Sequence, residues 1–179
     1  MSAATKKHRW RWTTLLRLYL AGWRPNRNVW NQLTLPKRLR VFPEAQRVLT
    51  EFGNVRFGGR KDPIRLNPAA GDAIAERIIL FEKKLDLRLY PVGIWPESGF
   101  WSSDDEAPIY VLVDEKGVVY TFEADVLRPL ASSFDRAVEY FVRRDWREKR
   151  DDLQTIDMSN KIWALEDQEC EPDLLEKAE

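Results

Sequence analysis

Two adjacent carboxylates, Asp114 and Glu115, stand between two runs of strand-forming residues in the stretch IYVLVDEKGVVYTF. Paired carboxylates can serve as the acid and base of a glycosidase when a cleft holds them about 5–10 Å apart. The same residues also fit a tight turn, because an Asp at the first turn position bonds its own backbone and Gly117 can adopt the left-handed conformation that follows. The pattern favours the turn, so we expect a hairpin over 109–122 without catalytic chemistry.

The side chains needed for nucleophilic catalysis or metal binding are scarce in this sequence. The single histidine, His8, lies in a basic lead-in, and the single cysteine, Cys170, lies in an acidic segment, so they do not have the spacing of metal ligands. The glycine-rich run GNVRFGG lacks the Lys-Ser/Thr of a phosphate-binding loop and follows a predicted helix. The acidic run SSDDEAP could offer oxygen ligands to a cation, but it lacks the spaced ligands and fixed glycine of a calcium loop. We therefore expect no catalytic residue, no cofactor site and no metal site.

Charge is segregated along the chain although the net charge is zero, with 29 acidic and 29 basic residues. Residues 1–60 contain thirteen Lys and Arg against two acids, and residues 151–179 contain ten Asp and Glu against two lysines. Such asymmetry fits an acidic segment that binds a basic partner or folds back on the protein's own basic end, and it also fits solvated tails. The run KKHRWRWTT combines charge and aromatic rings in a way that could attract single-stranded nucleic acid or an anionic membrane surface.

The length and hydropathy predict one cytoplasmic domain with extensions. A chain of 179 residues can bury a core without disulfide or metal support, and one cysteine allows no intramolecular disulfide, which favours a reducing compartment. The apolar stretch LLRLYLAGW is broken by Arg17 and is too short to span a membrane. We predict that 1–12 is a flexible basic extension, that 13–146 is the folded domain, and that 147–179 is an acidic tail that could dock on the domain.

Four helices are predicted from apolar residues at intervals of three and four, at 13–23, 43–52, 72–85 and 133–144. Asp72 is expected to open the third helix as its cap. The stretch LRLYPVGIW alternates like a half-buried strand in which Pro91 marks an edge or a bulge. Helices followed by strands and a final helix predict an α+β fold with an antiparallel sheet. The apolar face of the first helix is expected to comprise Trp12, Leu15, Leu16 and Tyr19.

Five segments occur in the order that they have in one known family. AGWRPNRNV at 21–29 is similar to its opening Gly-Trp-x-Pro-x-Arg-x-Val element, VLTEFGNVRF at 48–57 to the end of its helix with Glu-Phe-Gly, and LYPVG at 89–93 to its Tyr-Pro-hydrophobic-Gly strand. VDEKGVVY at 113–120 is similar to its Asp-Glu-x-Gly-x-Val-Tyr hairpin, and SSFDRAVEYFV at 132–142 to its closing helix. The chain thus resembles the SUKH superfamily, third subgroup.

This resemblance covers residues 15–144 and implies an α+β domain in which helices pack on a twisted antiparallel sheet of about six strands, with no catalytic residues. It also implies an immunity protein that binds and blocks a bacterial polymorphic or contact-dependent toxin, often a nuclease or deaminase. The alternatives are a non-catalytic regulatory interaction module, and a nucleic-acid or membrane-surface binder that works through the basic amino terminus. The chain departs from the family in its two extensions, in the insertion GIWPESGFWSSDDEAP, and at Asn54, where a glycine is common.

Contact with a partner is expected in the insertion, where an acidic run could mimic nucleic-acid phosphates in the basic cleft of a nuclease. Three other tryptophans, Trp23, Trp30 and Trp146, flank predicted helices and are expected in the core, because large aromatic side chains are usually buried. The residues predicted to bind the partner are Trp95, Trp101, Asp104, Asp105 and Glu106.

Overall fold

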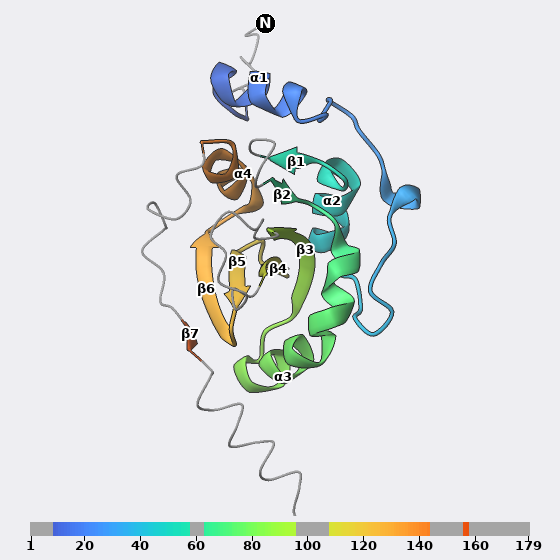
Figure 1. Cartoon of the computed structure of the whole chain (residues 1–179), viewed down its shortest axis with the longest axis vertical. Coiled ribbons are helices and arrows are strands. Elements are labelled where there is room, and N and C mark those ends of the chain that lie inside the picture. Colours follow the sequence, from blue (N-terminus) through green and yellow to red (C-terminus); the bar gives the residue numbers. More distant parts are fainter. Residues whose placement is uncertain (1–8, 58–62, 96–107, 144–155, 158–179) are drawn as a thin grey trace, which may run out of the picture.

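The structure is a computed structural model that describes residues 9–57, 63–95, 108–143 and 156–157 (Figure 1). Four α-helices and two short 3-10 helices accompany seven strands in the described residues. The elements in chain order are α1 (Trp12–Leu20), η1 (Trp30–Gln32), α2 (Pro43–Phe52), β1 (Arg56–Phe57), β2 (Ile64–Arg65), η2 (Pro68–Ile74), α3 (Ala75–Leu85), β3 (Leu89–Trp95), β4 (Ile109–Asp114), β5 (Val119–Glu123), β6 (Val126–Ala131), α4 (Phe134–Arg143) and β7 (Ile156–Asp157).

The seven strands form one sheet in which each strand pairs antiparallel with the next along the chain, in the order β1 to β7. The predicted α+β class and antiparallel sheet are confirmed, with seven strands where about six were expected. Three of them, β1, β2 and β7, are only two residues long. The register of β3 against β4 shifts between Pro91 and Gly93, as expected for a strand that contains a proline, because proline has no N–H to donate to the ladder.

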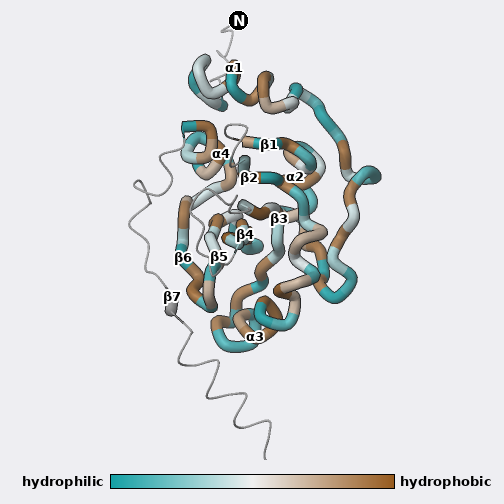
Figure 2. The backbone as a smooth tube through the Cα atoms, viewed as in Figure 1, coloured by the Kyte–Doolittle hydropathy of each residue, from teal (hydrophilic) through white to brown (hydrophobic). Residues whose placement is uncertain are grey.

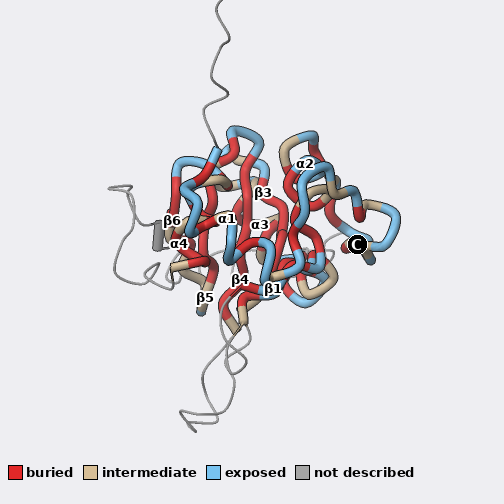
Figure 3. Tube along the Cα trace, turned by 90° about the horizontal axis from the view of Figure 1, so that it is seen from above, coloured by how far each residue is buried: buried red, intermediate tan, exposed pale blue. Residues whose placement is uncertain are grey.

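Both faces of the central strands are covered, and every residue of β4 is buried (Figure 3). Side chains alternate between the two faces of a strand, so Tyr110 and Val113 of β4 point to opposite sides. On the Tyr110 side, Phe122 of β5 meets Phe81 of α3, with ring centroids 5.5 Å apart. On the Val113 side, Tyr90 of β3 meets Phe42 at the start of α2, at 6.2 Å. Helices on both faces explain why these strands are apolar throughout.

Helices α2 and α4 occupy the predicted segments, but the third helix begins later than expected. The chain at Asp72 is still part of the 3-10 helix η2, and α3 begins at Ala75. The Asp72 carboxylate accepts a hydrogen bond from the backbone N–H of Lys37 at 3.0 Å, so it binds a neighbouring segment. The side chain that caps this region is Asn67, which accepts from Ala69 N–H at the start of η2. The prediction that Asp72 caps the third helix is therefore wrong.

Helix α1 forms where expected, and hydrophilic and hydrophobic residues are interspersed along it (Figure 2). Most of the predicted apolar face is nevertheless exposed. Trp12, Leu16 and Tyr19 expose 76%, 50% and 40% of their surface, and Leu15 is half-buried. The buried positions are Thr14 and Leu18. Packing against α4 fixes this orientation, since the Arg17 guanidinium donates to the Val142 carbonyl at 2.7 Å. The apolar spacing predicted the helix correctly and its buried face incorrectly.

The segment just before α1 packs on the core. Trp10 is 5% exposed, and its ring lies edge-on to Trp23 at 5.4 Å and to Phe52 at 6.0 Å. The expectation of a flexible extension over 1–12 thus differs from the structure at 9–12, because two large aromatic rings offer Trp10 a buried site. Residues 1–8 lie outside the described residues. Trp23 is buried as expected and Trp30 is half-buried, whereas Trp146 lies outside the described residues.

Candidate functional site

The paired carboxylates hold a turn. Asp114 ends β4 and is buried, and its Oδ1 accepts hydrogen bonds from the backbone N–H groups of Lys116 at 2.9 Å and Val118 at 2.8 Å. Its Oδ2 accepts from the Tyr120 hydroxyl at 3.1 Å. Burial, with the Asp114 carboxylate beside it, raises the pKa of Tyr120. Gly117 follows with φ of 88°, so the predicted hairpin is confirmed.

The second carboxylate of the pair lies at the surface. Glu115 forms an ion pair with Arg88 at 2.7 Å, and about half of each side chain is exposed. Its carboxylate therefore faces solvent while that of Asp114 faces the interior. The two groups do not converge on a shared cleft, which is the arrangement that acid and base chemistry requires.

The segment AGWRPNRNV binds the carboxyl end of α2. Trp23 stacks on Phe52 with ring centroids 6.3 Å apart, and its indole N–H donates to Glu51 Oε1 at 3.2 Å. The Arg27 guanidinium donates to the backbone carbonyls of Glu51 and Gly53. A cation at this end of a helix is favourable because the last carbonyls carry partial negative charge. The segment at 21–29, which resembles the opening element of the family, thus has a structural role at the end of α2.

The turn after α2 explains one departure of the sequence from the family pattern. A Cβ on Gly53 would lie 2.6 Å from the Leu49 carbonyl and 2.8 Å from the Leu33 side chain, so only glycine fits there. Asn54 follows with φ of 62°, in the left-handed region. Asparagine tolerates that conformation better than most residues. The asparagine therefore preserves the geometry that a glycine would give.

Arg9 joins two helices that are far apart in sequence. Its guanidinium donates to both carboxylate oxygens of Asp135 in α4 and to Glu51 in α2, and it lies 4.2 Å over the Trp10 ring. Burial opposes the charge of Arg9, but the hydrogen bonds to Asp135 and Glu51 outweigh it and raise its pKa. Two residues of the basic and aromatic run at the amino terminus, Arg9 and Trp10, are therefore engaged in contacts within the protein.

The hollows at the surface of the described residues include the following two. One, here called the basic groove, has a volume of about 410 Å³ and runs between α1, β1 and α4. The other, of about 570 Å³, lies beside α2 and includes Arg9 and Glu51, which are already engaged with each other. Within the part of the chain that the structure describes, no group of three His, Cys, Asp or Glu residues could hold a metal ion. The residues lining the basic groove are Arg17, Leu20, Ala21, Arg56, Phe57, Val142 and Arg143.

Comparison with models of protein families shows to which family this chain belongs. The model of the SUKH-3 immunity protein family matches residues 12–144, which contain all four α-helices and the first six strands. The chain belongs to the SUKH-3 immunity protein family. No curated protein and no solved structure gives a significant match. The resemblance to this family is therefore confirmed, and all five segments on which it rests lie within the matched residues. The structure shows that three of them stabilise turns or helix ends.

Membership of the SUKH-3 family indicates a role in toxin immunity and implies that a cognate toxin is bound. The family is generally non-enzymatic. Of the carboxylates singled out in the sequence, Asp114 binds a turn and Glu115 forms an ion pair. Among the described residues, no helix has the length and hydropathy needed to cross a membrane.

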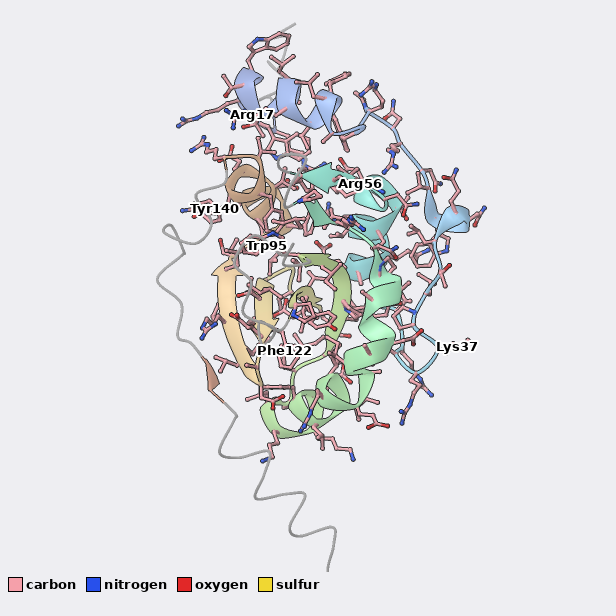
Figure 4. The ribbon with its side chains drawn as sticks, viewed as in Figure 1. Arg17, Lys37, Arg56, Trp95, Phe122 and Tyr140 are labelled. Atoms are coloured by element: carbon pink, nitrogen blue, oxygen red, sulfur yellow. The ribbon has the colours of Figure 1, made fainter. Side chains whose placement is uncertain are left out.

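The structure places one of the five residues predicted to bind the partner. Trp95 is the last residue of β3 and is half-buried against the core (Figure 4). Its Cα is paired with that of Ile109, the first residue of β4, so the insertion leaves and re-enters the sheet at this pair. The other four, Trp101, Asp104, Asp105 and Glu106, lie outside the described residues.

Sequence reasoning missed one surface of this SUKH-3 domain. Trp12, Leu16, Tyr19 and Leu20 project from α1 into solvent, and Leu20 also lines the basic groove. Their spacing is that of a buried helix face. The sequence pattern therefore singled out these residues but predicted that they are buried. Large exposed apolar residues that adjoin one another are typical of interaction sites.

Proposed function

We propose that this protein neutralises a cognate bacterial toxin by binding it and occluding its active site. The family match over residues 12–144 is the observation that carries the proposal. The toxin is of the polymorphic or contact-dependent kind, with nuclease or deaminase activity, and the protein acts on it in the cytoplasm without catalysis of its own. The use of Asp114, Glu115 and Arg9 in turns and ion pairs supports a binding function.

The insertion between β3 and β4 is the proposed contact surface. Its ends are fixed by the Trp95 and Ile109 pair in the middle of the sheet order, so it begins and ends on a rigid support. A standard protein interface buries about 1,600 Å² and depends on a few aromatic anchors. Trp95 and Trp101 would provide these anchors. Asp104, Asp105 and Glu106 would stand in for phosphates and accelerate capture of a basic cleft.

The nucleic-acid alternative is weakened by the contacts of the amino-terminal segment. Stacking on bases requires aromatic rings that are accessible. Of the two tryptophans in the basic run, Trp10 is buried against Trp23 and Phe52, which leaves Trp12 as the accessible ring. Phosphate binding requires cations that are free to exchange partners, and Arg9 already binds Asp135 and Glu51. A regulatory module without a toxin partner differs from the main proposal only in its partner, which the following experiment identifies.

The test is co-expression with the product of the adjacent gene. We expect that product to be harmful alone, to be harmless in the presence of this protein, and to co-purify with it. At low salt, the charge-neutral variant Asp104→Asn/Asp105→Asn/Glu106→Gln should associate with the toxin at least about tenfold more slowly, because charged side chains steer the encounter. The matched control Glu76→Gln/Asp86→Asn/Glu115→Gln removes the same charge from other exposed positions and should associate at the normal rate.

Two outcomes would count against the proposal. A neighbouring gene product that neither harms the cell nor binds the protein removes the toxin partner. Normal association of the Asp104, Asp105 and Glu106 variant, with slow association of the control, moves the contact surface away from the insertion and leaves the immunity role in place.

A further inference from the structure

The outer face of α1 and the basic groove form one continuous surface. The outer face, defined here as Trp12, Leu16, Tyr19 and Leu20, exposes between 40% and 81% of each side chain. Leu20 also lines the groove, where Arg17 of α1 and Arg56 of β1 contribute positive charge (Figure 4). A surface that combines exposed apolar side chains with fixed cations fits a segment that is both apolar and acidic.

The arginines of the basic groove differ from five other described arginines in their ion pairing. Arg9, Arg38, Arg47, Arg88 and Arg128 each have a carboxylate within 3.0 Å. Within the described part of the chain, by contrast, Arg17 and Arg56 form no ion pair, and no Asp or Glu lines the groove.

The third arginine of the groove is only weakly compensated. Arg143 meets Glu139 at 3.9 Å, near the limit of an ion pair. The positive charge of the groove is therefore left largely uncompensated by the described residues.

The sequence contains a segment with the complementary chemistry. Residues 158–179 hold seven Asp and Glu against two lysines. This segment begins directly after β7, which pairs with Val126 and Leu127 at the start of β6, the end of that strand that lies away from α4 and the groove, so the segment must run back along the domain to reach the groove. Its 22 residues can span roughly 70 Å when extended, which exceeds the roughly 40 Å diameter of a domain of this size. Its apolar residues are Met158, Ile162, Trp163, Ala164, Leu165, Leu174, Leu175 and Ala178.

We propose that residues 158–179 dock on their own domain, with the carboxylates in the basic groove and the apolar side chains on the outer face of α1. Attachment to the same chain favours this occupant over a separate molecule, because it gives an effective concentration in the millimolar range. Docking would cover apolar surface that otherwise faces water, and it would balance the charge of the groove. This inference does not depend on the identity of the toxin.

The single cysteine provides a direct test in the full chain. Cys170 lies between Glu169 and Glu171, within the proposed docking segment, so a nitroxide label can be attached there without further mutation. The label should broaden the backbone amide signals of residues 17–21, 56–57 and 142–143. The signals of α3 should keep their intensity, because α3 lies at the opposite end of the molecule from α1 (Figure 1).

Charge variants separate specific docking from chance proximity. Arg17→Gln/Arg56→Gln should lower the ratio of docked to undocked segment roughly two- to thirtyfold, as expected for the loss of two exposed ion pairs. The control Lys37→Gln/Lys83→Gln removes the same charge at exposed positions away from the groove and should keep the broadening. Adding salt should release the segment in the same way as the groove variant, since salt screens exposed charges.

A mixed sample identifies the molecule that supplies the segment. Isotope-labelled protein without nitroxide is combined with nitroxide-labelled protein that lacks the isotope. Broadening in this mixture means that a second copy occupies the groove, which overturns the proposal. Uniform or absent broadening in the chain that carries both the isotope and the nitroxide also overturns it. Broadening confined to the groove and α1 in the doubly labelled chain, and absent in the mixture, supports it.

Discussion

Replacing Trp10 with alanine tests whether the segment before α1 belongs to the folded core. A large aromatic side chain buries about 150–250 Å², worth about 4–6 kcal/mol at 25 cal/mol per Å². Residual structure in the unfolded chain reduces such figures by roughly 10–40%. Trp10 is 5% exposed and contacts the rings of Trp23 and Phe52. We therefore expect Trp10→Ala to lower the free energy of unfolding by about 3–5 kcal/mol, which is the usual range for buried aromatic residues.

Urea unfolding followed by circular dichroism measures this loss. With an m-value of about 2 kcal/mol per M, the midpoint should fall by about 1.5–2.5 M. The matched control is Trp12→Ala, because Trp12 lies two residues away and is 76% exposed. That variant should lower the free energy of unfolding by no more than about 1 kcal/mol, even with residues 158–179 docked on α1 as proposed above. If Trp10→Ala does not fold, Trp10→Phe keeps part of the buried area and should show a smaller loss in the same direction.

Equal effects of the two alanine variants, or a loss below about 1 kcal/mol for Trp10→Ala, would refute the packing of this segment. A larger loss for Trp12→Ala than for Trp10→Ala would mean that α1 buries the face that its apolar spacing predicts. Either result would restore the expectation of a flexible extension over residues 1–12.

Three further predictions concern the turns and the core. Asp114→Asn should cost about 1–3 kcal/mol in urea unfolding, because one of the three donors that bind Asp114 loses its acceptor, whereas Glu115→Gln at the surface should cost less than about 0.5 kcal/mol. Asn54→Ala should cost about 1 kcal/mol and lower the melting temperature by about 2–4 °C, because φ is 62° there, and Asn54→Gly should be close to neutral. The Tyr90 hydroxyl is buried without a hydrogen-bond partner among the described residues, and its burial raises the pKa of Tyr90 to about 12. The unfolded chain therefore loses this proton first, so stability should fall between about pH 10 and 12, and Tyr90→Phe should lessen that fall in unfolding measurements.

The local features of the fold were predictable because short segments determine them. Asp114 and Gly117 define a turn through bonds to their own backbone, and the structure shows those bonds. Pro43 opens α2 at its first position, where a missing N–H costs nothing. Features that depend on distant partners were missed. The burial of Trp10 requires Phe52, and the rotation of α1 requires α4. No pattern within residues 9–20 contains that information.

Less of the candidate site could be predicted than of the fold. Trp95 was singled out because, with Trp101, it brackets a polar stretch. It is the last residue of β3 and is half-buried. The exposed face of α1 and the basic groove were not expected, since the groove combines arginines from α1, β1 and α4 that are separated by up to 126 residues. A site assembled from three elements depends on the tertiary fold, whereas residue spacing reports only on neighbours along one element.

The shortness of the two outermost strands bears on how this protein behaves at high concentration. The sheet begins with the two residues of β1 and ends with the two residues of β7. An outer strand with many unpaired N–H and carbonyl groups invites another chain to add to it, and short outer strands offer few such groups. The described margins of the sheet therefore offer few groups to which a strand of another chain could bond, which disfavours the growth of fibres from either margin.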